Sequence, residues 1–282
     1  MSTFGFTPRG GGRGMNPGRL LIAVILAVVS AIGYFSMKQY NPVTGETQHV
    51  SMSVGQEIAL GLQAAPEMAA QYGGLDPDPE AQQMVKQVGQ RILAGSAAGK
   101  SEYQFDFHLL ADPETINAFA LPGGQVFITN GLLRRLTTEG QLAGVLGHEI
   151  GHVVGRHGAE QMAKAQLTQG LTGAAVIATY DPNDPNSRAS AQVAMLVGQL
   201  VTMKFGRDDE TESDRLGVRF LAESGYDPRA MLVVMQVLAE ASQGAAPPEF
   251  FSTHPNPENR MEVIEAAIRE RFPEGVPAEA TP

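Results

Sequence analysis

The strongest constraint in the sequence is a group of polar residues inside an apolar helix. His148, Glu149 and His152 interrupt a segment that begins at Thr138, with the capping-box-like spacing Thr-x-x-Gln, and continues with apolar residues at helical intervals. Residues four apart on an α-helix lie about 40° apart around its axis, so both imidazoles point the same way. Burying these side chains without partners would be costly. The pattern therefore predicts a metal site on a long helix over about residues 138–164.

Zinc hydrolases use this arrangement of residues. Glu149 is offset by about 100° from the first His, close enough to hold a water and accept its proton. A catalytic zinc usually has three protein ligands and one open position, so a third ligand is needed. On a continuous helix His157 lies about 180° from His148, which predicts a place on the opposite surface.

A later acidic segment offers the third ligand. Glu210 and Asp214 are four apart on one helical face, so Glu210 can bind the metal while Asp214 accepts the free N–H of a metal-bound His. Glu212 points away and is interpreted as a solvated charge. His254, between Thr253 and Pro255, is either a surface residue or a group that reaches the metal or the oxyanion.

Composition narrows the metal chemistry. The 282 residues include six His and no Cys, which excludes thiol nucleophiles, iron–sulfur clusters and Cys-type zinc sites. The formal charge of −10 argues against a nucleic-acid-binding protein, which needs a basic face. His49 and His108 have no partner in the pattern and are interpreted as structural or solvated.

The N-terminus differs from the rest of the chain. Its first 40 residues contain no acid and the basic residues Arg9, Arg13, Arg19 and Lys38. We expect a flexible basic segment at 1–19 and a membrane anchor at 20–37, which is near the lower length limit of about 17 residues for a spanning helix. The basic residues favour an N-terminus inside the cytoplasm and the remainder of the chain outside it. The alternatives are a signal cleaved near Ala31, giving a secreted protein, and a buried core helix.

The remaining pattern is mainly helical with one small sheet. Strands are expected at 103–109 and 125–129, with a helical turn through residue 119 between them. A disordered tail is expected at 273–282. The other helices are expected at 54–72, at 79–93 behind an Asp78 N-cap, as a hairpin at 166–203, and at 208–224, 228–242 and 257–271.

From about residue 54 to residue 260 the sequence resembles the zinc metallopeptidase family of the CAAX prenyl protease, HtpX and the periplasmic BepA-type peptidases. Four ordered motifs carry the resemblance: Asn117–Gly124, His148–His157, Phe205–Gly217, and Thr253-His254-Pro255 with Arg260. It implies a mainly α (α+β), gluzincin-type peptidase domain at 50–272, with a small sheet beside the active-site helix. The chain would be a single-anchor member without helical repeats.

The resemblance also implies roles for individual residues. It implies one Zn²⁺ per chain, with the ligands His148, His152 and Glu210. Glu149 would be the catalytic base, Asp214 the supporting acid, and His254 with Arg260 would have a regulatory or oxyanion-side role. Strand 125–129 resembles the family's edge strand, to which polypeptide substrates could add by β-augmentation.

The first functional hypothesis is a zinc metalloendopeptidase that acts on exported or membrane proteins in protein quality control. The second is a binding or chaperone module that keeps zinc for structure, with His254 as a fourth ligand, since structural zinc sites are closed by four ligands. A third, a non-peptide zinc hydrolase, has no sequence feature in its favour.

Overall fold

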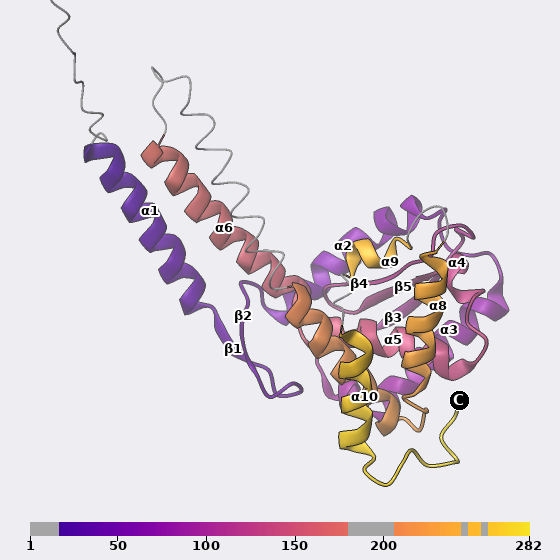
Figure 1. Ribbon diagram of the computed structural model, residues 1–282. Helices are drawn as coiled ribbons and strands as arrows, with labels where there is room; N and C mark the ends of the chain where they lie inside the picture. Colours follow the sequence, from indigo (N-terminus) through magenta and orange to yellow (C-terminus); the bar gives the residue numbers. More distant parts are fainter. Residues whose placement is uncertain (1–16, 180–205, 244–247, 255–258) are drawn as a thin grey trace, which may run out of the picture. The chain divides into compact units, whose positions relative to one another are not determined.

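The structure, a computed structural model, describes residues 17–179, 206–243, 248–254 and 259–282 (Figure 1). The chain divides into two compact units. One contains residues 1–33 and 166–201, and the other contains residues 34–165 and 202–282. The described elements are mostly helices with two small sheets, which confirms the expected fold class.

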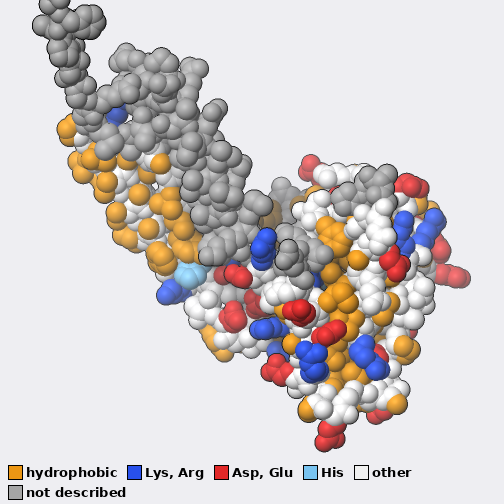
Figure 2. Space-filling view, viewed as in Figure 1, with side chains coloured by type: hydrophobic (Ala, Val, Ile, Leu, Met, Phe, Trp, Pro, Cys, Tyr) orange, Lys and Arg blue, Asp and Glu red, His pale blue; other side chains and the backbone are white. Residues whose placement is uncertain are grey.

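The first unit contains a helix that is long and apolar enough to cross a membrane. This helix, α1 (Pro17–Ser36), has a mean hydropathy of 2.1 over its most apolar window, and its apolar side chains are largely exposed (Figure 2). The later part of α6 (His157–Thr179) packs against it. The approach is so close at Gly170 that a Cβ there would lie 2.1 Å from Ser30 Oγ. The first half of the predicted hairpin therefore belongs to α6, and residues 180–203 lie outside the described residues.

A three-stranded sheet forms the centre of the second unit. Its strands are β3 (Asp106–Leu110), β4 (Ala118–Leu121) and β5 (Gln125–Thr129), in the order β3-β5-β4. β5 pairs in parallel with β3 and antiparallel with β4. The prediction that 125–129 is an edge strand is therefore wrong, because β5 has a partner on each side. The predicted helical turn through residue 119 is also wrong, because the positive φ angles of Gly123 and Gly124 fold β4 back onto β5.

Helices cover both faces of this sheet. Alternate residues of β5 explain why: Val126 and Ile128 belong to the main core with α3 (Pro79–Gly95) and α5 (Glu139–Val154), whereas Phe127 packs on the other face with α2 (Val54–Gln71). The predicted Asp78 cap of α3 is present, since its carboxylate accepts hydrogen bonds from two backbone N–H groups of the first turn. A short helix α4 (Asn130–Leu133) connects β5 to α5, and a 3₁₀ turn (Ala97–Lys100) follows α3.

The predicted continuous helix at 138–164 is wrong, because it breaks after Val154. Arg156 has a φ of 59°, which no α-helix accommodates, and α6 begins at the next residue. The carbonyl groups at the end of α5 find partners elsewhere: Asn41 Nδ2 donates to the Val154 carbonyl at 2.7 Å, and Gln48 donates to that of Gly155. Both donors belong to a hairpin of β1 (Lys38–Tyr40) and β2 (Thr47–His49), which the sequence did not indicate.

The C-terminal part adds four helices among the described residues. They are the helix at residues 206–223, α8 (Ala230–Ala241), α9 (Phe250–Thr253) and α10 (Arg260–Arg271). The predicted disordered tail at 273–282 is wrong, because backbone hydrogen bonds fix it to the unit. The Pro282 carbonyl accepts from Gly140 N–H at 2.9 Å, and the Thr281 carbonyl accepts from Asp227 N–H at 2.8 Å.

Two glycines of α2 allow a matched test of how closely this helix approaches the sheet. A Cβ at Gly61 would lie 2.0 Å from the Pro122 carbonyl oxygen, whereas a Cβ at Gly55 would meet nothing within 4 Å. Gly61→Ala should lower the free energy of unfolding by about 1–3 kcal/mol through overpacking. Gly55→Ala should leave it unchanged or raise it by up to about 1 kcal/mol. Urea unfolding followed by circular dichroism measures both, and equal effects would contradict the close approach.

Candidate metal centre

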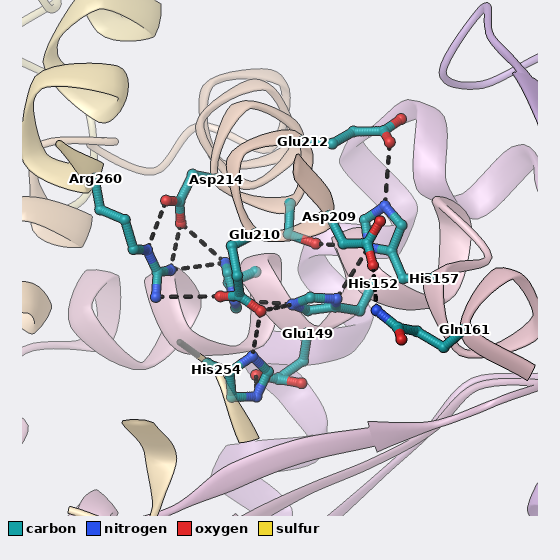
Figure 3. A network of polar contacts seen from close by, with 12 residues as sticks. Glu149, His152, His157, Gln161, Asp209, Glu210, Glu212, Asp214, His254 and Arg260 are labelled. Carbon is teal, nitrogen blue, oxygen red and sulfur yellow. Dashed lines mark hydrogen bonds and ion pairs between the residues drawn. The ribbon is translucent and has the colours of Figure 1, made fainter. Parts of the chain in front are cut away.

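Three elements bring a compact group of ligand atoms together in the second unit (Figure 3). α5 contributes His148 and His152, the helix at 206–223 contributes Glu210, and His254 follows α9 directly. Each of these side chains offers one ligand atom, and the four atoms lie within 4.8 Å of one another. The structure thus gathers the three predicted ligands and places His254 among them.

The spacing of the three predicted ligands suits a tetrahedral cation. The Nε2 atoms of His148 and His152 are 3.1 Å apart. They lie 3.4 and 3.3 Å, respectively, from the two carboxylate oxygens of Glu210. Ligands about 2.0–2.1 Å from a tetrahedral zinc would be about 3.3–3.4 Å apart. The distances here, of which the two to Glu210 end on different oxygens, are close to that value.

Several buried atoms around this group lack hydrogen-bond partners within the described part of the chain. They are both carboxylate oxygens of Glu149, Oε2 of Glu210 and Nε2 of His254. Glu149 has no exposed surface, and its Oε1 is 3.4 Å from His254 Nε2. Buried polar atoms almost always have partners, so their convergence fits a site for a cation and water. A donor set of imidazole and carboxylate, without sulfur, is one that zinc accepts.

A second layer of charged groups orients His148. Its Nδ1 lies 3.0 Å from Oδ1 of Asp214, the residue predicted to hold a metal-bound His. Arg260, the first residue of α10, donates to both oxygens of that carboxylate, at 2.8 and 2.6 Å. Its Nη1 also lies 3.2 Å from Glu210 Oε2. Arg260 therefore binds the carboxylates that support the site, and its side chain is only 3% exposed.

Burial and hydrogen bonding shift the pKa values of these groups in different directions. Burial raises the pKa of Glu149, which favours a proton acceptor that works near neutral pH. Burial would also raise the pKa of Glu210, but the nearby imidazoles of His148 and His152 outweigh it and lower that pKa. Burial would lower the pKa of His148, yet hydrogen bonds to Asp214 and Glu210 raise it to about 9. For His152 burial dominates, and its pKa falls well below 6.5.

The structure corrects the predictions for His157 and Glu212. Because the helix breaks at Arg156, the ring of His157 returns to the metal centre, and its Nδ1 lies 2.9 Å from Nδ1 of His152. Glu212, interpreted as a solvated charge, contacts the other nitrogen of that ring at 3.1 Å. Helical spacing could not predict this contact, because the angle between His148 and His157 was calculated for a helix that continues through Arg156.

The two remaining His residues have structural contacts, as expected from the sequence. His108 Nε2 lies 2.9 Å from Gln125 Oε1 across the β3–β5 pair. The ring of His49 stacks on Tyr34, with centroids 4.7 Å apart.

Comparison with known proteins gives consistent matches. Residues 79–268 match the sequence pattern described as Peptidase family M48. The chain is 32% identical over 246 residues to the beta-barrel assembly-enhancing protease of Yersinia pestis and 31% identical over 256 residues to that of Escherichia coli K12, with 86% of the chain and 50% of each relative covered. It is 32% identical over 241 residues to the mitochondrial metalloendopeptidase OMA1 of Schizosaccharomyces pombe, covering 84% of the chain and 68% of that protein. The chain spans about half the length of the two bacterial relatives.

The raised pKa of His148 predicts how stability depends on pH when metal is removed. Its folded pKa of about 9 exceeds the ordinary 6.5, so the stabilisation is full below pH 6.5 and is lost as pH rises through 9. We expect metal-stripped protein to lose up to about 3 kcal/mol over this range. Metal-loaded protein should show the opposite trend, because protons compete with a cation for the imidazoles.

Urea unfolding between pH 6 and pH 9, with a chelator or with excess Zn²⁺, measures both trends. Metal-stripped His148→Gln serves as the control and should be nearly flat over the same range. If the free energy of unfolding changed with pH in the same way with and without metal, His148 would not be a metal ligand.

Proposed function

Because the chain belongs to peptidase family M48, as its motifs predicted, we propose that it is a zinc-dependent metalloendopeptidase acting on exported or membrane proteins. The observation that carries the proposal is the convergence of His148, His152 and Glu210 beside the Glu149 carboxylate, which has no hydrogen-bond partner among the described residues. The three would hold one Zn²⁺ per chain. The relatives are named as a beta-barrel assembly-enhancing protease and a mitochondrial metalloendopeptidase, and protein quality control is the setting proposed for this chain.

The protein groups divide the reaction between them. A zinc ion bound by His148, His152 and Glu210 would supply Lewis acidity, which would acidify water and polarise a peptide carbonyl. Glu149 accepts the proton that the attacking water loses and passes it to the leaving amine, a role that its raised pKa supports. Asp214, held by two hydrogen bonds from Arg260, orients His148 so that Nε2 faces the site. In this role Arg260 positions a ligand and is not a donor to the oxyanion.

His254 distinguishes an open site from a closed one. Its Nδ1 lies 3.0 Å from Glu210 Oε1, and its ring stacks on Phe250 with centroids 4.4 Å apart. A fourth protein ligand at this place would exclude the water that hydrolysis requires. The described arrangement therefore supports a latent form of the enzyme, in which His254 closes the site.

Polypeptide substrates are proposed to bind along the sheet. β5 is the central strand, and among the described residues β4 has no strand paired on its other side. β4 also contacts α5 and α9, the elements next to the metal centre. An extended peptide that adds to β4 would gain main-chain hydrogen bonds with little demand on its sequence. This assignment replaces the strand at 125–129 as the substrate-binding edge.

The N-terminal helix supports a membrane location. α1 satisfies the length and hydropathy of a membrane span. Arg9 and Arg13 before it, and Arg19 in its first turn, favour a cytoplasmic N-terminus. We propose that it anchors the peptidase domain on the periplasmic side. Removal of the segment near Ala31, which would give a secreted protein, is the alternative.

Replacing the proposed base should separate metal binding from catalysis. Glu149→Gln preserves the shape of the side chain but cannot accept a proton, so casein cleavage should fall about 10²–10⁴-fold. Zinc content, measured by atomic absorption, should remain at one ion per chain. Glu262→Gln, on the exposed side of α10, is the charge-matched control and should cleave normally. Normal cleavage by Glu149→Gln would exclude the mechanism.

Removing His254 tests whether the site is latent or structural. His254→Ala should open one coordination position and raise zinc-dependent casein cleavage severalfold, because water could then occupy it. Ser252→Ala, in the short helix α9 directly before His254, is the control and should cleave casein as the unmodified protein does. Cleavage that is absent in both the unmodified protein and His254→Ala would favour a binding module with structural zinc.

A further inference from the structure

The turn after α5 creates a place for the His157 ring beside the metal centre. Gly155 is required there, because a Cβ on it would lie 2.5 Å from His157 Nε2. The left-handed conformation of Arg156 is fixed by its buried guanidinium. That group donates to Glu57 Oε1 at 3.0 Å and to the Met52 carbonyl at 2.7 Å. The backbone around His157 is thus fixed independently of the metal ligands.

Three contacts define the orientation of this ring (Figure 3). Its Nδ1 is 2.9 Å from Nδ1 of His152 and 3.3 Å from Oγ of Ser213. Its Nε2 is 3.1 Å from Oε2 of Glu212. The His157 side chain is only 3% exposed, so these protein groups, and not solvent, decide which nitrogen carries the proton.

The donors and acceptors match in only one way if His152 binds a cation. Its Nε2, which faces Glu210 and His148, must then be unprotonated, so its Nδ1 carries the hydrogen and donates. His157 Nδ1 is the acceptor of that hydrogen bond. The Nε2–H of His157 in turn donates to the Glu212 carboxylate, and every contact is satisfied with both rings neutral.

We propose that His157 is a positioning residue for the metal ligand His152, and that Glu212 fixes the tautomer of His157. The two imidazole ligands would then each be tied to a carboxylate of the helix at 206–223. His148 reaches Asp214 directly, whereas His152 reaches Glu212 through one additional imidazole. Such supporting contacts raise the basicity of a ligand and fix its ring. The inference rests on the metal site of the proposed function.

Metal affinity tests the proposal without reference to cleavage. His157→Phe keeps an aromatic side chain but has neither ring nitrogen. Zn²⁺ affinity, measured by competition with a chelator, should therefore fall about 10–100-fold. His157→Asn places an amide oxygen near the acceptor position and should recover most of that loss. Bound Co²⁺ should show an altered visible spectrum in His157→Phe and a nearly normal one in His157→Asn. A purely structural His157 would change thermal stability without this pattern.

Glu212 provides a second test that does not alter the ring. Glu212→Ala should weaken Zn²⁺ binding severalfold, whereas Glu212→Gln retains an acceptor and should bind nearly as tightly as the unmodified protein. Asp208→Ala, which removes an exposed charge from the same helix, should leave the affinity unchanged. If His157→Phe does not fold, this comparison of Glu212 and Asp208 variants tests whether His157 positions His152.

Two results would overturn the inference. One is unchanged Zn²⁺ affinity in folded His157→Phe or in Glu212→Ala. The other is an equal loss in Glu212→Ala and Asp208→Ala, which would reflect general charge. Failure of the unmodified protein to bind Zn²⁺ would instead overturn the proposed function itself.

Discussion

The burial of ionisable side chains around α5 is the constraint on which the rest of the structure depends. Glu149, Glu210 and Asp214 are almost completely buried, and isolated carboxylates in such a place would be very unfavourable. Arg260 compensates part of this charge through Asp214 and Glu210. A dication would supply the rest and would also give the unpartnered oxygens of Glu149 a hydrated neighbour. The helices that carry these residues are therefore held together by electrostatics as well as by apolar packing.

The turn at the end of α5, next to this centre, is held in place by residues from distant segments of the chain. The side chains of Asn41 and Gln48 are held in place there, because each donates to a carbonyl group at the C-terminal end of the helix. Unpaired carbonyls at a buried helix end would be costly. The ion pair of Arg156 with Glu57 brings the beginning of α2 to the same turn. Residues far apart in the sequence thus hold the turn between α5 and α6 in place.

The sequence predicted local features well and long-range ones poorly. Helical spacing and the cap at Asp78 were sufficient for α3, and the four-residue intervals correctly grouped His148 with His152 and Glu210 with Asp214. These features depend on neighbours within one or two turns. The ordered C-terminal segment, and the hydrogen bonds that join the β1–β2 hairpin to the end of α5, depend on partners far away in the chain. β4 pairs with its neighbour β5, but only after a turn at two glycines with positive φ. A left-handed Arg is also unusual, so periodicity alone extended α5 too far.

The position of α9 links the metal centre to the edge of the sheet. Phe250 N–H donates to the Ile116 carbonyl at 3.1 Å, directly before the start of β4. Glu249 accepts hydrogen bonds from Tyr72 at 2.6 Å and from Asn117 at 3.3 Å. The segment that ends at His254 is therefore bound to the strand proposed to pair with substrate. In the proposed function, a peptide on that edge and His254 at the metal would both lie next to this one short element.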